Sequence, residues 1–255
     1  MERISLMNLF ELGTQRGNSR SKLNPKLKKR VFGFTQGLCI IDLVQTIDSI
    51  SKTADFLSSL AEKKRQILLV GTSDHIKDSL SSYAAKFNSG LMPYINYRWL
   101  GGTLTNWSTI KKTLKTLEKL DNILENKEFF EKLSRNEQLN VIKKQERVAK
   151  FFAGLRPLRS NRPGAVIVVD GPNNAIAIKE AESVGVPVIV LTNTSIKILP
   201  KDLSNTITCN IHSISSVDFI LNYLIESYNK GFAVGNEKRL LETENTPNSN
   251  NITAK

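Results

Sequence analysis

Residues 165–191, AVIVVDGPNNAIAIKEAESVGVPVIVL, decide the fold. The run 165–169 is continuously apolar and mostly β-branched, which predicts a strand buried on both faces. Residues 173–184 then follow a helical pattern that Gly185 closes. A second apolar strand follows at 186–191. A strand, a helix and a strand in this order form the crossover unit of a parallel sheet.

The same pattern extends in both directions along the chain. Apolar runs predict further strands at 38–41, 67–70, 91–95 and 206–211. Helical spacing predicts helices at 4–12, 43–60 and 215–228, and another to residue 87 that Ser73 or Asp74 caps. We therefore expect an α/β domain, a parallel sheet with helices on both faces.

One long segment interrupts this alternation. Residues 105–152 contain two amphipathic helical patterns and no strand, with a break at 126–135. This predicts an antiparallel helical hairpin inserted into the α/β domain. The expected division is a discontinuous α/β domain at 1–104 and 153–232, a hairpin arm at 105–152, and a disordered polar tail at 233–255.

Composition narrows the range of possible functions. The chain has 255 residues, 36 Lys and Arg against 24 Asp and Glu, a net charge of +12 and a pI of about 9.7. No apolar run has the length of a membrane span, and no secretory signal is visible. With two cysteines and two histidines, dense metal or acid–base chemistry is not expected, and Cys39 and Cys209 fit small buried hydrophobes. The charge favours a polyanionic partner.

The positive charge is concentrated near the N-terminus. Residues 12–41 hold seven cations, no acid and many turn-forming residues. The cations are Arg16, Arg20, Lys22, Lys26, Lys28, Lys29 and Arg30. A loop of this composition can bring backbone N–H groups and cations to phosphates. A solvated basic surface loop is the alternative.

Candidate catalytic sites are poor. Residues 71–75 follow a strand and open a helix, but they lack the glycine and lysine pattern of a nucleotide fingerprint. Asp170 ends a strand, where α/β enzymes often place a catalytic group, yet a helix cap and turn is the favoured interpretation. The second hypothesis is an enzyme that binds a nucleotide or another small molecule at the strand ends, Gly71 and Asp170. A protein-docking role for the arm is the third.

Residues 98–106, RWLGGTLTN, resemble the motif of a known family, the second protein of the small ribosomal subunit in its bacterial and organellar form. Other segments occur in the family's order: Asn24-Pro25-Lys26, Ile40-Ile41-Asp42-Leu43, Leu69-Val70-Gly71-Thr72, Gly154-Leu155-Arg156, 175–181 and Gly185-Val186-Pro187. The resemblance covers roughly residues 5–232. This sequence lacks the two histidines that the family has within 13–18 and some of the acids that the family has within 191–213. Both changes put in question any metal or protein contact that those loops make in the family.

The resemblance implies a flavodoxin-like domain with a helical arm, and a structural rRNA-binding protein of the small subunit, not an enzyme. It implies no cofactor and no membrane partner. The expected partners are small-subunit rRNA and neighbouring ribosomal proteins, among them the large OB-fold first protein. We expect a cytoplasmic bacterial ribosome, with a mitochondrial or plastid ribosome as the alternative.

The predicted RNA-binding residues extend beyond the seven cations. They include Asn24 of the basic segment, and Arg98, Trp99, Asn106 and Trp107 of the motif. The two tryptophans can stack on bases, but packing at the root of the arm is the favoured role. Neither a catalytic residue nor a metal ligand is predicted.

Overall fold

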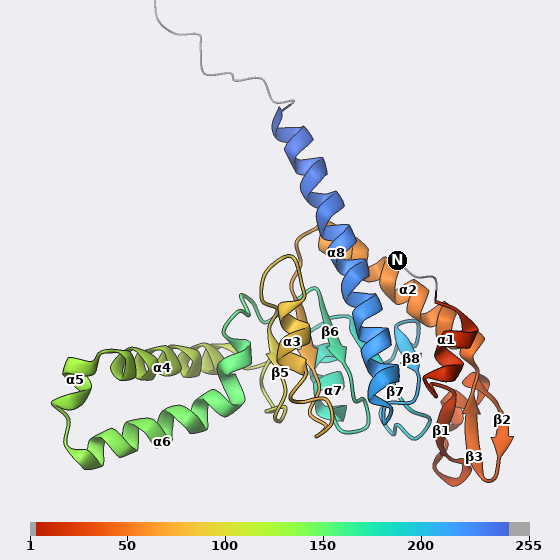
Figure 1. The fold of residues 1–255 in the computed structure, drawn as a ribbon, viewed down its shortest axis with the longest axis horizontal. Helices are drawn as coiled ribbons and strands as arrows, with labels where there is room; N and C mark the ends of the chain where they lie inside the picture. Colours follow the sequence, from red (N-terminus) through yellow and green to blue (C-terminus); the bar gives the residue numbers. More distant parts are fainter. Residues whose placement is uncertain (1–3, 245–255) are drawn as a thin grey trace, which may run out of the picture.

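A parallel five-stranded sheet lies at the centre of the computed structural model, which describes residues 4–244 (Figure 1). All neighbouring strands are parallel. In spatial order the strands are β5 (Tyr94–Ile95), β4 (Ile67–Val70), β6 (Ala165–Val168), β7 (Val188–Thr192) and β8 (Thr206–Thr208). The strands predicted from the continuous apolar runs at 67–70, 165–169 and 186–191 are therefore confirmed.

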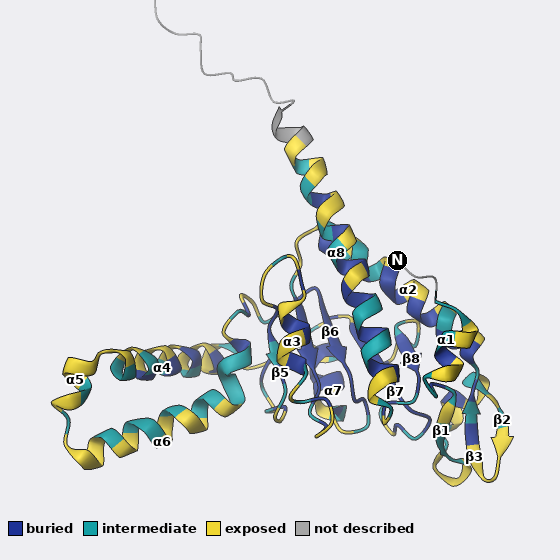
Figure 2. Cartoon of the chain, in the orientation of Figure 1, coloured by how far each residue is buried: buried dark blue, intermediate teal, exposed yellow. Residues whose placement is uncertain are grey.

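Helices cover both faces of this sheet, and alternate strand residues enter two separate cores. Leu69 and Ile167 pack in the core formed with α2 (Leu43–Glu62), α3 (Leu80–Ala85) and α8 (Ile214–Glu244). Leu68 and Val166 pack on the other side, with α7 (Ala175–Ser183) and the start of α4 (Trp107–Glu125). Figure 2 shows the sheet buried between these layers. The expected flavodoxin-like α/β fold is confirmed.

The N-terminal segment is not the loop that its composition suggested. After α1 (Leu6–Glu11) the chain forms a separate antiparallel sheet of order β1-β3-β2. Its elements are β1 (Arg16–Ser19), the 3-10 helices η1 (Arg20–Lys22) and η2 (Pro25–Arg30), β2 (Val31–Thr35) and β3 (Leu38–Ile41). The strand expected at 38–41 exists, but it belongs to this sheet and not to the central one. We call residues 16–41 the basic lobe.

The inserted segment forms two long helices and a short one at their turn. They are α4, α5 (Lys127–Glu131) and α6 (Arg135–Phe152), followed by the 3-10 helix η3 (Ala153–Leu155). The side chain of Ser134 caps α6 and Glu137 bonds back to it, in the pattern of a capping box. In Figure 1 these helices project from the body as an arm.

Two helices differ from expectation. The predicted cap at Ser73 or Asp74 is wrong: α3 begins at Leu80 after a series of turns. The Ser73 hydroxyl instead donates to Asp170. The tail expected from 233 is also wrong as far as Glu244, because α8 continues to that residue. The rest of that expectation, 245–255, lies outside the described residues.

The long C-terminal helix is held against α2 by two close approaches. A Cβ on Gly231 would collide with Ser58, and one on Gly235 would lie 2.7 Å from Glu62 Cα. Nearby, the Arg239 guanidinium donates to the Glu62 carbonyl at 2.9 Å. None of the helices within residues 4–244 combines the length and the apolar character that crossing a membrane requires.

Candidate nucleic-acid interface

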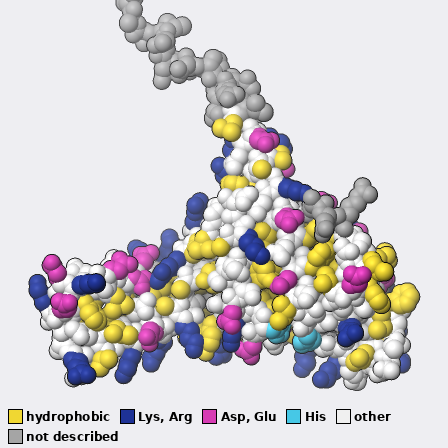
Figure 3. All heavy atoms as spheres, in the orientation of Figure 1, with side chains coloured by type: hydrophobic (Ala, Val, Ile, Leu, Met, Phe, Trp, Pro, Cys, Tyr) yellow, Lys and Arg dark blue, Asp and Glu magenta, His cyan; other side chains and the backbone are white. Residues whose placement is uncertain are grey.

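Six of the seven predicted cations of the basic lobe have exposed side chains. They are Arg16, Arg20, Lys22, Lys26, Lys28 and Lys29, which we call the basic face. None of them forms an ion pair with another residue in the range 4–244. Arg20 lies 4.7 Å from the ring centroid of Phe34, so an aromatic ring supports its guanidinium. Lys and Arg side chains gather at the lower right of Figure 3, where this lobe lies.

The basic lobe is fastened to the sheet where β7 ends. The main-chain N–H of Asn18 donates to Thr194 Oγ1 at 3.0 Å, and its amide donates to Ser195 Oγ at 2.8 Å. Asn24 donates to the carbonyls of Thr194 and Ile196 through its N–H and its amide. The lobe is therefore an ordered platform on the carboxyl ends of the strands.

Asn24 has a structural position within this platform. Its Oδ1 accepts the N–H of Lys26 at 2.9 Å and so caps η2. Since its amide is also engaged by the protein, Asn24 positions the neighbouring lysines rather than presenting a free group.

A cleft of about 680 Å³ opens beside this connection. Its walls are Ser21, Lys22, Leu23, Asn24, Pro25, Ser195, Ile196 and Lys197. Lys197 is exposed and belongs to the loop after β7, so it adds a cation from a distant part of the sequence to the edge of the basic face. The sequence marks Lys197 only as a charge in a divergent loop, because its distance in sequence from Lys22 hides their proximity.

Arg30, the seventh cation, points into the protein. It donates to the carbonyl of Leu203 at 2.8 Å, to the carbonyl of Thr206, and to Ser49 Oγ at 3.2 Å. Burial lowers the pKa of this guanidinium, and Asp48 partly opposes the shift. Arg30 therefore joins the basic lobe to β8 and α2, and we set it apart from the basic face.

The motif at 98–106 folds around one carboxylate, that of Glu180 in α7. Oε2 accepts from the indole of Trp99 at 2.9 Å and from the N–H of Gly102 at 3.1 Å. Oε1 accepts from the N–H groups of Leu104 and Thr105 and from the Thr105 hydroxyl, at 2.8 to 3.0 Å. The turn at Gly101 and Gly102 is thus filled by the protein's own carboxylate.

These contacts also set the charge of Glu180. Burial would raise its pKa, but the N–H and O–H donors outweigh burial and hold the pKa of this carboxyl below its usual value. Glu180 is 7% exposed, and no sequence pattern distinguishes it from the other acids of α7.

The four motif residues predicted to bind RNA do not form one group. Trp99 is 6% exposed and packs in the core, and Trp107 is half-buried against the same core, which favours the packing role for both. Asn106 is exposed and its Oδ1 accepts from the hydroxyls of Ser108 and Thr109. Only Arg98 is exposed with no ion-pair partner among residues 4–244.

The carboxyl ends of β4, β6, β7 and β8 meet at a second cleft of about 410 Å³, which includes His75, Asp170, Asn193 and His212. Asp170 does not cap α7, whose N-cap is Asn174. Its Oδ2 accepts from the Ser73 hydroxyl and from the Asn173 amide, so it ties two strand-end loops together. Burial raises the pKa of Asp170, and the bonds from Asn173 partly counter this. Residues 4–244 contain no grouping of three His, Cys, Asp or Glu suited to a metal ion.

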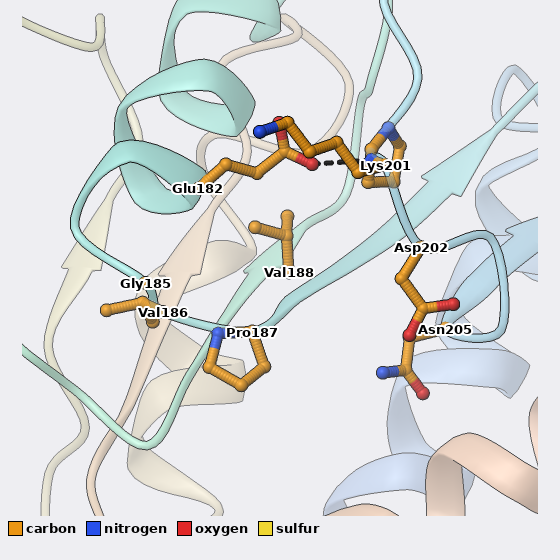
Figure 4. Close-up of a pocket in the computed structure, with 9 residues that line it drawn as sticks. Glu182, Gly185, Val186, Pro187, Val188, Lys201, Asp202 and Asn205 are labelled. Atoms are coloured by element: carbon orange, nitrogen blue, oxygen red, sulfur yellow. Dashed lines mark hydrogen bonds between the residues drawn. The ribbon is translucent and has the colours of Figure 1, made fainter.

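A third hollow, of about 320 Å³, lies at the opposite ends of the strands (Figure 4). There Glu182 accepts the N–H of Lys201 at 2.5 Å, and Asp202 and Asn205 lie across from Val186 and Pro187. The Asp202 carboxylate is bonded to the N–H and hydroxyl of Ser204, which lowers its pKa. The carboxylates of Glu182 and Asp202 are thus engaged by local bonds, and we assign this hollow no role.

Comparison with known proteins gives one consistent result. A model of the family described as ribosomal protein S2 matches residues 9–231. The chain is 32% identical over 247 residues to the small ribosomal subunit protein uS2 of Wolinella succinogenes, covering 96% of this chain and 89% of that protein. The proteins of the same name from Desulforapulum autotrophicum and Koribacter versatilis are 31% and 29% identical, over 96% and 98% of this chain and 83% and 80% of theirs.

Proposed function

The chain belongs to the ribosomal protein S2 family, and we propose that it binds small-subunit rRNA through the basic face. It is a structural constituent of the small ribosomal subunit, takes part in translation and is not an enzyme. The observation that carries the proposal is the basic face itself: six exposed cations, none paired with an acid among residues 4–244, on a lobe anchored to the sheet.

The physical argument is electrostatic. Lys and Arg side chains that neutralise RNA phosphates release condensed counterions, so affinity falls steeply as salt increases. An anchored platform loses little conformational entropy on binding, in contrast to a free basic tail. Lys22 and Lys197 line one cleft, so the fold brings two cations from distant segments of the chain to the same place.

Paired neutralisation tests the proposal. We expect Lys28→Gln with Lys29→Gln to weaken incorporation into small subunits and to reduce the slope of log affinity against log salt by about one unit for each phosphate that is no longer neutralised. The readout is sucrose-gradient sedimentation of the variant with subunits from cells depleted of the protein, at several salt concentrations.

The matched control is Lys143→Gln with Lys144→Gln, two exposed lysines on α6 whose replacement removes the same charge away from the basic lobe. Equal behaviour of the two double variants would assign the effect to net charge and reject the basic face. Migration of the wild-type chain apart from intact small subunits would reject the ribosomal role as a whole.

We also propose that a neighbouring ribosomal protein docks on the apolar side chains of the N-terminal region, and that it is the large OB-fold first protein. Phe32 is 81% exposed on β2, and Met7 and Phe10 of α1 are 66% and 59% exposed. Exposed Phe and Met side chains are enriched in protein–protein interfaces. Phe32→Ser should release that neighbour from the subunit while the rRNA-bound chain stays, as mass spectrometry of purified subunits would report.

We propose a bacterial cytoplasmic ribosome as the location, since the matched relatives named here are bacterial. A mitochondrial or plastid ribosome is the alternative. Co-fractionation of the tagged chain with either the cytosolic or the organellar small subunit in its own cells decides between them.

A further inference from the structure

The root of the arm carries a second group of exposed cations, around Tyr97. This tyrosine follows β5 and is 43% exposed. The Lys150 ammonium, at the end of α6, lies 4.1 Å from its ring centroid. Phe151 meets the same ring in an edge arrangement with the centroids 5.1 Å apart. Arg98, the next residue along the chain, is exposed.

The fold holds this cluster in place from two sides. A Cβ on Gly154 would collide with Tyr94, so η3 presses directly on β5 and fixes the end of α6 beside residue 97. Asn96 donates its amide to the carbonyl of Lys77 at 3.1 Å, which ties the loop after β5 to the loop after β4. The cluster is therefore preformed in the free chain.

Its charge is uncompensated. Among residues 4–244, neither Arg98 nor Lys150 forms an ion pair. Lys77 also lies nearby, but it is paired with Asp74 at 2.7 Å. The positive surroundings act on the phenol as well: bonding and charge from Lys150, then Lys77 and Arg98, lower the pKa of Tyr97 against the opposing effect of burial. A phenol in such a field is a stronger hydrogen-bond donor to an anion.

We propose that Tyr97, Arg98 and Lys150 bind one phosphodiester of small-subunit rRNA, as a contact separate from the basic face. The guanidinium supplies a planar pair of donors that matches phosphate oxygens, the ammonium supplies a point charge, and the phenol supplies an O–H donor. This inference rests on the proposed rRNA-binding function and adds a binding site at the other end of the molecule. In Figure 1, β5 and the arm lie at one side of the body and the basic lobe at the other.

Phosphate is favoured over an acidic protein segment by the composition of the site. Phosphate contacts in nucleic-acid complexes come from Arg and Lys with hydroxyl donors, including Tyr. The edge-packed Phe151 and the cation over the ring leave Tyr97 mainly its hydroxyl and outer edge for a partner. This geometry fits a phosphate, a small group with several hydrogen-bond acceptors, better than a protein segment that needs an apolar surface to pack on.

The test measures binding of the full chain to small subunits from cells depleted of it, across salt concentrations. We expect Arg98→Gln with Lys150→Gln to lower the salt slope by about one unit, the value for one phosphate. Tyr97→Phe should weaken binding several-fold with no change of slope, because it removes a neutral donor only. The control Lys143→Gln with Lys144→Gln should leave the slope near that of the wild type.

A second measurement identifies the partner. A photoreactive benzoylphenylalanine in place of Tyr97 should crosslink to rRNA in assembled subunits. Crosslinks only to protein, or a slope for the arm-root double variant equal to that of the control, would overturn this site. If the arm-root site fails in this way but the Lys28 and Lys29 variant still lowers the slope, the proposal of the basic face is still supported. If no variant changes binding, the proposed function fails as well.

Discussion

At the scale of single residues, Glu180 connects two distant parts of the chain. Its carboxylate receives five donors from residues 99–105, which resemble the family motif. Glu180→Gln keeps the size but turns an NH₂ group toward N–H donors. We expect a loss of at least about 2 kcal/mol in the free energy of unfolding at pH 7, since an unpaired buried donor costs about 1–3 kcal/mol. Urea denaturation measures it.

The effect of pH on this residue has a definite sign. The pKa of Glu180 is lower in the folded chain than its ordinary value, so its stabilisation is present above about pH 4.3 and is lost as pH falls. The difference between wild type and Glu180→Gln should therefore shrink below about pH 4. Glu182→Gln, on the same helix, keeps a carbonyl oxygen for the N–H of Lys201 and removes only the charge, so it serves as the control and should cost less than about 1 kcal/mol. Equal losses would mean that the motif does not depend on Glu180.

Asp170 should respond to pH in the opposite direction. Burial raises its pKa, so the folded state binds the proton more tightly than the unfolded state. Its contribution to stability then falls as pH rises from about 4 through the raised pKa. Asp170→Asn keeps an oxygen for Ser73 and Asn173 and removes the charge. Asp170→Asn also places an NH₂ group where Oδ1 has no partner among residues 4–244, so we expect the free energy of unfolding of the variant, relative to wild type, to rise between pH 3.5 and pH 7; a relative fall over that range would contradict this.

At the scale of elements, α8 is stabilised by contact with α2 along its length. Gly231→Ala places a methyl group against Ser58 and should lower the unfolding free energy by about 1–3 kcal/mol. Helix propensity by itself predicts the reverse, a gain of about 1 kcal/mol. Val234→Ala, at a site 40% exposed on the same helix, is the control and should change little. A stabilised Gly231→Ala variant would show that the two helices separate easily here.

The elements differ in how far sequence patterns predict them. The central strands and the arm were predictable because buried apolar runs and helical spacing are local signals. β1 and β2 were not: residues 16–19 and 31–35 form short strands without a buried residue, so no continuous apolar run marks them, and β1 in addition pairs with β3 across the intervening helices η1 and η2. The helix beyond residue 232 was missed because the segment is polar, whereas the close packing of Gly231 on Ser58 and of Gly235 on Glu62 is a contact between distant segments.

The candidate site was predictable in its charge but not in its assembly. The run of cations near the N-terminus is a local feature, and six of its seven members are exposed. The inward turn of Arg30, the filling of the motif by Glu180 and the meeting of Lys150 with Tyr97 depend on contacts between distant segments. Such contacts leave no periodic pattern in a single sequence.

At the scale of the whole molecule, both proposed RNA contacts lie near the carboxyl ends of the parallel strands, one after the edge strand β5 and the other after β7. The loop after β5 carries Tyr97 and Arg98, and the loop after β7 holds the basic lobe. The two contacts share no side chain and lie at opposite sides of the body, so their free energies should add.

Combining Lys28→Gln and Lys29→Gln with Arg98→Gln and Lys150→Gln should therefore lower the salt slope by the sum of the two separate reductions. Binding to depleted subunits at several salt concentrations measures this, with the Lys143 and Lys144 variant added to each pair as the control for net charge. A combined effect no greater than that of one pair would mean that the RNA engages the two ends in alternation. If the two reductions in slope add, the RNA contacts the basic face and the arm root at the same time, because the sheet fixes the distance between these two sites.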